Sequence, residues 1–251
     1  MNAWRLVGRH ALVYRRAWVV FLSGFLEPVF YLLSIGVGVG AMINDVQAAG
    51  QTVPYAVFVA PAMLAASAMN GAVMDSTFNM FFRMKYGKVY EVALATPLSV
   101  GDIAVGELIW SLARGGIYAT GFLGLMAAMG LTLSWWALLA VPATLLIGFA
   151  FAGVGMWACT YVRSWQDFEF VTLVMMPMTL FSGTFFPVDT VEGPARWLVE
   201  ATPLYRGVAL CRELTIGVPG WASVVSVVYL AVMGACGLWL ARRRLGLLLQ
   251  K

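Results

Sequence analysis

Long apolar runs alternate with short polar stretches along the whole 251-residue chain. A helix needs about 20 apolar residues to cross a hydrocarbon core roughly 30 Å thick, and six runs approach or exceed that length. They cover residues 17–43, 53–82, 103–130, 135–162, 168–186 and 221–241. The pattern predicts an all-α polytopic membrane protein in which six transmembrane helices form one domain over residues 1–251.

The first sixteen residues have a different periodicity from the runs that follow. Apolar side chains recur at helical spacing among His10 and four arginines, which is typical of an amphipathic helix lying in the interfacial layer of a membrane. A secretory signal peptide is the competing interpretation. The apolar run that follows is too long for the hydrophobic part of such a peptide, so we expect this helix to be retained.

The segment 187–220 is divided by prolines into two short amphipathic stretches, 195–201 and 204–215. We expect two short helices here, either as a surface cap or as a re-entrant pair before the last span. Apolar side chains such as Trp197 and Leu204 are expected to enter the membrane interface. Charged side chains, Arg212 among them, are expected to remain in water.

The stretch Arg83–Pro97 is a polar interruption between the second and third apolar runs. It carries three cations, one carboxylate and two tyrosines, and predicts a short helix exposed to a partner protein. Lys85, Lys88, Tyr90 and Glu91 are the candidate contact residues. The alternative is a solvated turn whose cations only fix the topology. Just after it, Ser99 is expected to cap the third transmembrane helix, with Asp102 in the first turn.

The composition supports a membrane protein, and the distribution of cations orients it. The chain is 61% hydrophobic and only 11% charged, whereas soluble domains contain about a quarter charged residues. Lys and Arg concentrate beside both termini and the stretch 83–97, which places these on the cytoplasmic side of the membrane. The inside set is Arg5, Arg9, Arg15, Arg16, Arg83, Lys85, Lys88, Arg163, Arg242, Arg243, Arg244 and Lys251; the outside set is Arg196, Arg206 and Arg212.

Four charged residues fall inside predicted spans: Glu27, Asp75, Glu107 and Arg114. Each costs about 2.5–3.5 kcal/mol at a helix centre, so each needs a partner or water. We hypothesise that Glu27 pairs with Arg114, with Glu107 as the competing partner and Asp75 nearer the cytoplasmic surface. Such a pair either fixes helix register or lines a path or gate for a substrate headgroup.

Two glycines of the first span, Gly36 and Gly40, stand four residues apart and permit close approach of another helix. They predict either ordinary packing within the chain or a dimer seam.

Several chemistries have no counterpart in the sequence. The chain has no GxxxxGK[ST] phosphate loop, and Gly87-Lys88-Val89 lacks its spacing and hydroxyl. His10 is the only histidine, which excludes His-dependent triads and zinc sites built on several histidines. We therefore expect no enzymatic activity, no metal and no cofactor bound by this chain.

Four motifs occur in an order and spacing that resemble the ABC-2 type permeases, in the branch of nodulation-factor and drug exporters. They are Phe25–Leu33 (FLEPVFYLL) with its following glycines, Tyr90-Glu91 with Ala95–Ile103 (ATPLSVGDI), Phe181–Val188 (FSGTFFPV) and Ala201–Tyr205 (ATPLY).

The resemblance implies that Arg83–Pro97 is a coupling helix and that the chain is the permease of an exporter. It implies a second permease copy, identical or related, and two cytoplasmic ATP-binding cassette subunits that bind ATP and Mg²⁺. The expected partners also include membrane lipid and exclude nucleic acid. The expected cargo is amphipathic: a lipid-linked saccharide, a lipid or a hydrophobic drug. The alternatives are a non-transporting membrane scaffold or sensor, and an ion-coupled secondary transporter, which would predict inverted repeats.

Overall fold

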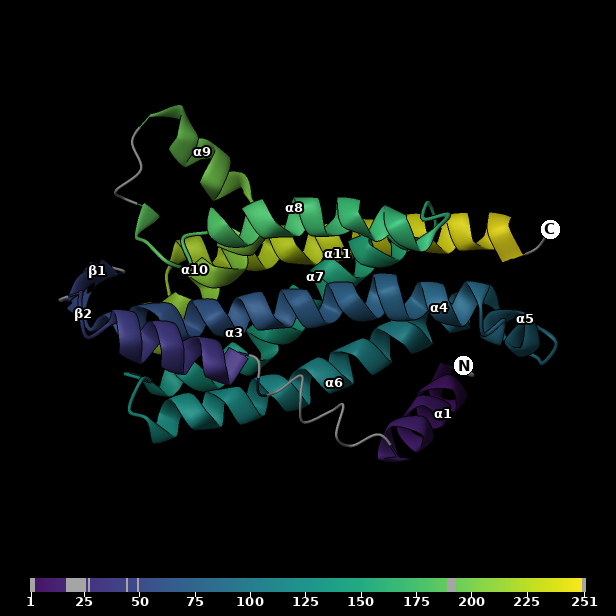
Figure 1. Cartoon of the computed structure of the whole chain (residues 1–251), viewed down its shortest axis with the longest axis horizontal. Coiled ribbons are helices and arrows are strands. Elements are labelled where there is room, and N and C mark those ends of the chain that lie inside the picture. The colour runs from purple at the N-terminus through teal and green to yellow at the C-terminus, as the bar shows by residue number, and fades with distance from the viewer. Residues whose placement is uncertain are drawn as a thin grey trace.

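Long helices run side by side along the major axis of the molecule (Figure 1). The computed structural model describes residues 3–16, 26, 28–43, 45–48, 50–188 and 193–249. The α-helices are α1 (Ala3–Arg16), α3 (Tyr55–Met74), α4 (Met80–Lys85), α5 (Val89–Leu94), α6 (Val100–Ala128), α7 (Ala140–Cys159), α8 (Phe168–Leu180), α9 (Pro194–Ala201), α10 (Pro203–Ile216) and α11 (Trp221–Leu249). Two π-helical segments, η1 (Leu32–Val39) and η2 (Asp75–Asn79), and two 3₁₀ segments, η3 (Trp135–Leu139) and η4 (Trp165–Asp167), are also present.

The helical membrane architecture is confirmed. In the described part of the chain, three helices are long and apolar enough to cross a membrane: Tyr55–Lys85, Trp135–Cys159 and Trp221–Leu248. Helix α6 has 29 residues but carries three charges, and α8 has 13 residues. The first predicted span falls partly outside the described residues, so the count of six spans stays a prediction.

The start of α6 follows the predicted capping signal, whereas the end of α11 differs from the prediction. The predicted cap is present, because the Asp102 amide donates to Ser99 Oγ at 3.1 Å and the Ser99 amide donates to Asp102 Oδ2 at 3.1 Å. The last helix, expected to stop at the arginines after Ala241, instead continues to Leu249. Arginine is a good helix former, and Arg244 extends over the Tyr161 ring at 4.0 Å.

The polar loop between the first two spans contains a β-hairpin that the sequence pattern did not predict. Strand β1 (Val46–Ala48) pairs antiparallel with β2 (Gln51–Val53), with Val46 opposite Val53. The turn contains Gly50 with a φ of +77°, a left-handed conformation that glycine adopts without strain.

The two predicted short helices of the segment 187–220 are confirmed as α9 and α10, but their surroundings differ from the expectation. Leu204 and Val208 are buried inside the protein rather than in the membrane interface. Arg212, expected in water, is only 8% exposed. Trp197 of α9 is exposed, and its entry into the membrane interface stays a prediction. Helix α10 is therefore part of the core, because it packs on α3, α7 and α11.

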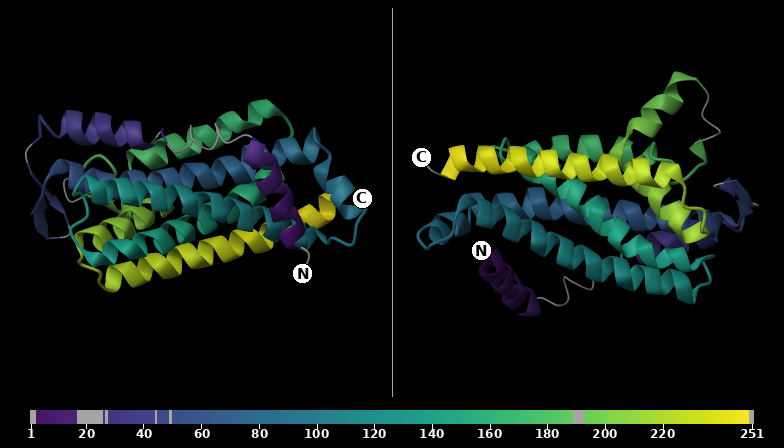
Figure 2. Two further views of the ribbon diagram at one scale, coloured as in Figure 1. Left: turned by 90° about the horizontal axis from the view of Figure 1, so that it is seen from below. Right: turned by 180° about the vertical axis from the view of Figure 1, so that it is seen from behind.

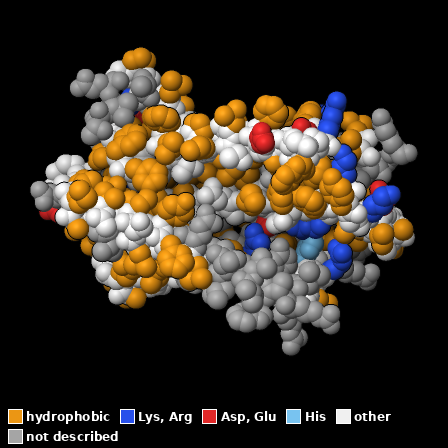
Figure 3. All heavy atoms as spheres, in the orientation of Figure 1, with side chains coloured by type: hydrophobic (Ala, Val, Ile, Leu, Met, Phe, Trp, Pro, Cys, Tyr) orange, Lys and Arg blue, Asp and Glu red, His pale blue; other side chains and the backbone are white. Residues whose placement is uncertain are grey.

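The two ends of the molecule carry different elements. The hairpin, α9 and α10 lie at one end, whereas α1, α5 and the end of α11 lie at the other (Figures 1 and 2). Helix α1 lies across the long helices rather than along them (Figure 2). On the face in Figure 3, apolar side chains cover the middle and Lys and Arg gather toward the end that carries α4 and α5.

Helix α7 occupies the centre of the bundle and contacts α3, α6, α10 and α11. Its approach to α11 depends on glycine, because a Cβ at Gly153 would lie 2.6 Å from the Gly234 carbonyl oxygen. Likewise, a Cβ at Gly237 would lie 2.6 Å from the Gly153 carbonyl carbon. The predicted packing residue Gly36 is buried, and its Cβ would lie 3.7 Å from Ala56 Cβ of α3, so it packs within the chain. Gly40 follows η1 in a turn.

The Gly153→Ala variant is expected to be less stable than the wild type, since the new methyl group meets backbone atoms that cannot rotate away. Overpacking of this kind costs about 1–3 kcal/mol, which outweighs the gain in helix propensity. The melting temperature in detergent should fall by several degrees. Gly124→Ala in α6 is the matched control, since among the described residues no atom outside its own helix backbone lies within 4 Å of its Cβ position. Equal melting temperatures for both variants would contradict the close contact of α7 and α11.

Candidate functional site

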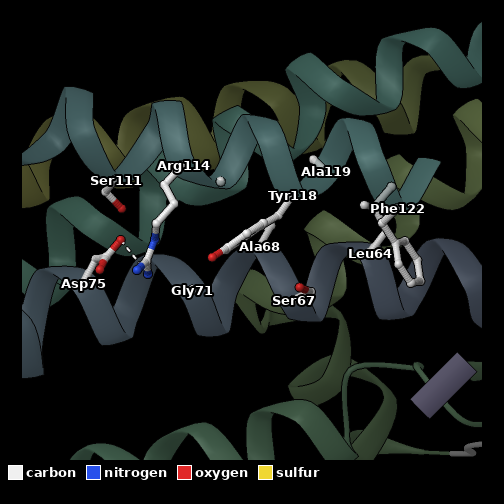
Figure 4. A pocket seen from close by; sticks show the side chains of 11 residues that line it. Leu64, Ser67, Ala68, Gly71, Asp75, Ser111, Arg114, Tyr118, Ala119 and Phe122 are labelled. Atoms are coloured by element: carbon white, nitrogen blue, oxygen red, sulfur yellow. Dashed lines mark ion pairs between the residues drawn. The ribbon is translucent and has the colours of Figure 1, made fainter. Parts of the chain in front are cut away.

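A buried ion pair joins Asp75 of η2 to Arg114 of α6 (Figure 4). Arg114 Nη2 lies 2.8 Å from Asp75 Oδ2, and the two side chains are 12% and 4% exposed. Asn79 Nδ2 donates to Asp75 Oδ1 at 2.7 Å. A π-helical segment often occurs at a functional position, and here η2 holds the acidic member of the pair. The pair therefore connects the second and third predicted spans.

A small cavity lies beside this pair, between α3 and α6 (Figure 4). Its volume is about 20 Å³, which is enough for one water molecule. Ser67, Ser111 and Tyr118 contribute hydroxyl groups to its lining. Among the described residues, no group is hydrogen-bonded to Ser111 Oγ. In this conformation the cavity suits a bound water between two helices and has no room for a substrate headgroup.

A second buried cluster is centred on Glu107 of α6, whose side chain is 4% exposed. Its carboxylate forms an ion pair with Arg83 of α4, accepts from the Tyr90 hydroxyl of α5 at 2.9 Å, and lies 3.2 Å from His10 Nε2 of α1. Arg83 Nη1 also lies 3.2 Å from His10 Nε2, and Arg83 Nε donates to the Asn79 carbonyl oxygen at 3.1 Å. One carboxylate thus connects four helices.

These contacts bear on the competing partners considered for the intramembrane charges. Arg114 pairs with Asp75, which is buried within the protein, while Glu107 pairs with Arg83. Glu27 lies outside the described residues, so its pairing with Arg114 stays a prediction. The sequence contains a signal for both pairs. Two helices that form an antiparallel hairpin bring together residues at equal distances before and after the turn. The midpoints of Asp75–Arg114 and of Arg83–Glu107 in the sequence both lie within one residue of Ala95.

The predicted contact residues of the stretch Arg83–Pro97 have different environments. Tyr90 is fully buried, so it cannot present its side chain to a partner, and burial raises the pKa of its phenol well above the usual value. Lys88 and Glu91 are exposed, with 3.9 Å between Nζ and Oε2. Lys85 is also exposed, and its ammonium donates to the Arg163 carbonyl oxygen.

Two exposed residues of this stretch were not among the predicted contacts. Tyr86 and Val92 are both well exposed, beside Lys88 and Glu91. Large apolar side chains on a short polar segment are the sequence signal that could have identified them. The exposed surface formed by Lys85, Tyr86, Lys88, Glu91 and Val92 is called the α5 surface below.

Helix α1 confirms the helical part of the amphipathic prediction and adds a contact. Leu6 and His10 are buried, with the His10 ring 5.7 Å from that of Trp110 in α6, whereas Trp4 and Leu12 are exposed. One side of α1 therefore packs on α6 and another presents apolar groups, as expected for a helix at a membrane surface.

Comparison with known proteins identifies the family. Residues 1–216 match the ABC-2 type transporter model. The chain belongs to the ABC-2 type transporter family.

Named relatives agree with this assignment. The ABC-2 chain is 35% identical to nodulation protein J of Rhizobium leguminosarum bv. viciae, with 98% of this chain and 94% of that protein aligned. It is 34% identical to nodulation protein J of R. leguminosarum bv. trifolii, with 86% and 80% aligned. For nodulation protein J of Rhizobium meliloti (strain 1021), the identity is 31% and the coverage 87% and 84%.

Family membership and the apolar helices make the chain an integral membrane protein and a transport component of an ABC exporter. A chain of this family is not itself catalytic, and the family implies a partnership with ATPase subunits.

The variants Asp75→Leu and Arg114→Leu are each expected to unfold more easily than the wild type, since each breaks the buried ion pair by removing one of its two charges. Such losses are about 3–5 kcal/mol. The double variant should recover part of this loss, because both charges are gone. Thermal unfolding of the four proteins in detergent measures the coupling. Additive effects in the double variant would contradict a direct pair, and Asp45→Leu at an exposed position is the control.

The Glu107→Gln variant is expected to loosen α5 and α1 without unfolding the bundle. Removal of the carboxylate charge abolishes the ion pair between Glu107 and Arg83 and weakens the acceptor of the Tyr90 hydroxyl. Amide hydrogen exchange across residues 86–95 and tryptic cleavage after Lys88 should both accelerate relative to Glu169→Gln, an exposed carboxylate. Unchanged exchange across residues 86–95 would refute the role of Glu107 as their anchor.

Proposed function

We propose that this chain is the permease subunit of an ATP-driven exporter and that α5 is its coupling helix. The observation that carries the proposal is the attachment of α5 to Glu107: Tyr90 points inward to the α6 carboxylate, whereas the α5 surface points outward. A force applied to that surface by an ATPase would therefore reach α6, α4 and α1 together.

The mechanical argument depends on the length of α5. A helix of six residues is not stable by itself in water, so its position must be set by tertiary contacts. Tyr90 supplies a buried anchor, and Glu91 and Lys88 remain available at the surface. A short helix that is anchored on one side and exposed on the other can transmit a displacement of the ATPase to the bundle, which a solvated turn cannot do as well.

The proposed orientation places α5 and both termini in the cytoplasm of a bacterial inner membrane. The location of α1, α5 and the end of α11 at one end of the molecule supports it, as does the excess of Lys and Arg on that side. Two permease copies, identical or related, and two cassette ATPases would form the transporter. The cassettes, and not this chain, would bind ATP and Mg²⁺.

The proposed cargo is an amphipathic molecule: a lipid-linked saccharide, a lipid or a hydrophobic drug. Support comes from the ABC-2 family and from the relatives named nodulation protein J. The cavity beside Arg114 gives no support, since it holds only one water.

Substitution of the α5 surface tests the proposal. The Lys88→Ala/Glu91→Ala variant is expected to assemble in the membrane but to lose most of the stimulation of cassette ATPase activity by lipid or drug. The measurement is the ATPase rate of the purified permease–cassette complex. Glu200→Ala, on α9 at the opposite end, is the control and should behave as the wild type.

Two results would overturn this function. If no cassette ATPase co-purifies with the wild-type chain, a scaffold or sensor explains it better. If transport in vesicles follows an ion gradient without ATP, the chain is a secondary transporter. If the cassette binds and the Lys88→Ala/Glu91→Ala variant retains full stimulation, the ATPase contacts a surface other than α5.

A further inference from the structure

A second pocket is lined by residues of β1, α3 and α10. The β1–β2 hairpin and α10 lie at the end of the molecule opposite α5 (Figure 1). Its volume is about 190 Å³, far larger than that of the cavity beside Arg114. Arg212 and Glu213 of α10 both line it, together with Phe58 of α3, Gln47 of β1 and Tyr205. A cation and an anion therefore meet in one pocket.

Arg212 is held in place by two backbone carbonyl groups and one aromatic ring. Its Nε donates to the Phe58 carbonyl oxygen at 3.3 Å, its Nη2 donates to the Gly183 carbonyl oxygen at 2.9 Å, and its Cζ lies 3.8 Å from the centre of the Phe58 ring. In the part of the chain that the structure describes, no carboxylate is paired with it. Burial lowers its pKa to about 10, which leaves it charged at neutral pH. A buried cation with unused donors is costly unless an anion joins it.

Glu213 complements Arg212 within the same pocket. Its Oε2 accepts from the Ser223 hydroxyl, and its side chain is only partly buried. Among the described residues, no Lys or Arg forms an ion pair with it. The pocket thus offers one site for a negative group and one for a positive group. Hydrogen bonds within the chain already hold the Arg212 and Glu213 side chains in position.

The position of the pocket indicates which molecules can reach it. Phe58 lies in the first turn of the apolar helix Tyr55–Lys85, and Ser223 lies at the start of the apolar helix Trp221–Leu248. The ends of spanning helices lie at the level of lipid headgroups. A pocket at this depth is therefore exposed to phospholipid headgroups at high local concentration. Its volume is large enough for a headgroup but too small for an acyl chain.

We propose that this pocket binds the zwitterionic phosphoethanolamine headgroup of a membrane phospholipid. The phosphate would accept from Arg212, whose planar set of N–H donors suits phosphate, and the ammonium would donate to Glu213. The bound headgroup would connect α3, α10 and the hairpin. This site does not depend on ATP or on a cassette subunit, so it stands or falls separately from the exporter function.

Ligand binding to the purified chain in detergent tests this site. The probes are dihexanoyl phosphatidylethanolamine, dihexanoyl phosphatidylglycerol and inorganic phosphate, each followed by thermal unfolding and by native mass spectrometry. The ethanolamine lipid should raise the melting temperature of the wild type in a concentration-dependent manner, since it binds the folded state. Phosphatidylglycerol and phosphate should give much smaller shifts.

Two variants separate the charges of the headgroup. Glu213→Gln should bind the ethanolamine lipid about tenfold more weakly or worse, the size expected for loss of a hydrogen bond to a charged group. Its affinity for phosphatidylglycerol should not fall. Arg212→Gln should lose both lipids. Because Arg212 is buried and its substitution also affects folding, the conclusion rests on Glu213→Gln. Glu200→Gln on α9 is the control and should match the wild type.

Three results would overturn the proposal. Equal stabilisation of the wild type by both lipids would show that the ammonium is not recognised. Stabilisation by inorganic phosphate as large as that by the ethanolamine lipid would identify a simple anion site. An unchanged preference for ethanolamine in Glu213→Gln would place the lipid elsewhere on the surface.

Discussion

The buried carboxylate of Glu107 is the constraint on which the α5 end of the molecule depends. A carboxylate removed from water is costly unless it is paired and hydrogen-bonded, and Arg83, Tyr90 and His10 meet that requirement from three other helices. None of these helices can shift alone without leaving a buried polar group unsatisfied. The short helix α5 and the transverse helix α1 are thereby attached to the bundle, although neither is long enough to be fixed by apolar burial alone.

The second buried pair, Asp75–Arg114, lies about two helical turns away along the same two helices. Because both pairs are centred near Ala95, they fix the same register between the α3–α4 helix and α6. A slip of one helix past the other would break both pairs together. Because the register is fixed, a displacement of α5 would be transmitted to the membrane-spanning parts of both helices.

Hydropathy and capping signals predicted the helices, the Ser99 cap and the two short helices before the last span, because each depends on residues close in sequence. They could not predict the partners of the charges. Hydropathy gives the depth of Asp75 and Glu107, but not the rotation of their helices, which tertiary packing decides. Tyr90 was misplaced for the same reason, since a six-residue helix has too little periodicity to define an inner face. The three-residue strands of the hairpin are too short for any alternating pattern to be recognised.

The contrast between the two ends separates two kinds of polar site. At the α5 end, Glu107 is satisfied by residues of this chain, so its cluster serves as a joint that transmits displacement and has no remaining demand for a ligand. At the α10 end, Arg212 and Glu213 are positioned by the chain but paired with no opposite charge in its described part.

The helix Tyr55–Lys85 contributes Phe58 to the second site and Arg83 to the first. Its π-helical segment η2 interrupts the regular backbone pattern between them. A single helix therefore connects the joint to the pocket, and its least regular segment is the one that holds Asp75 against Arg114.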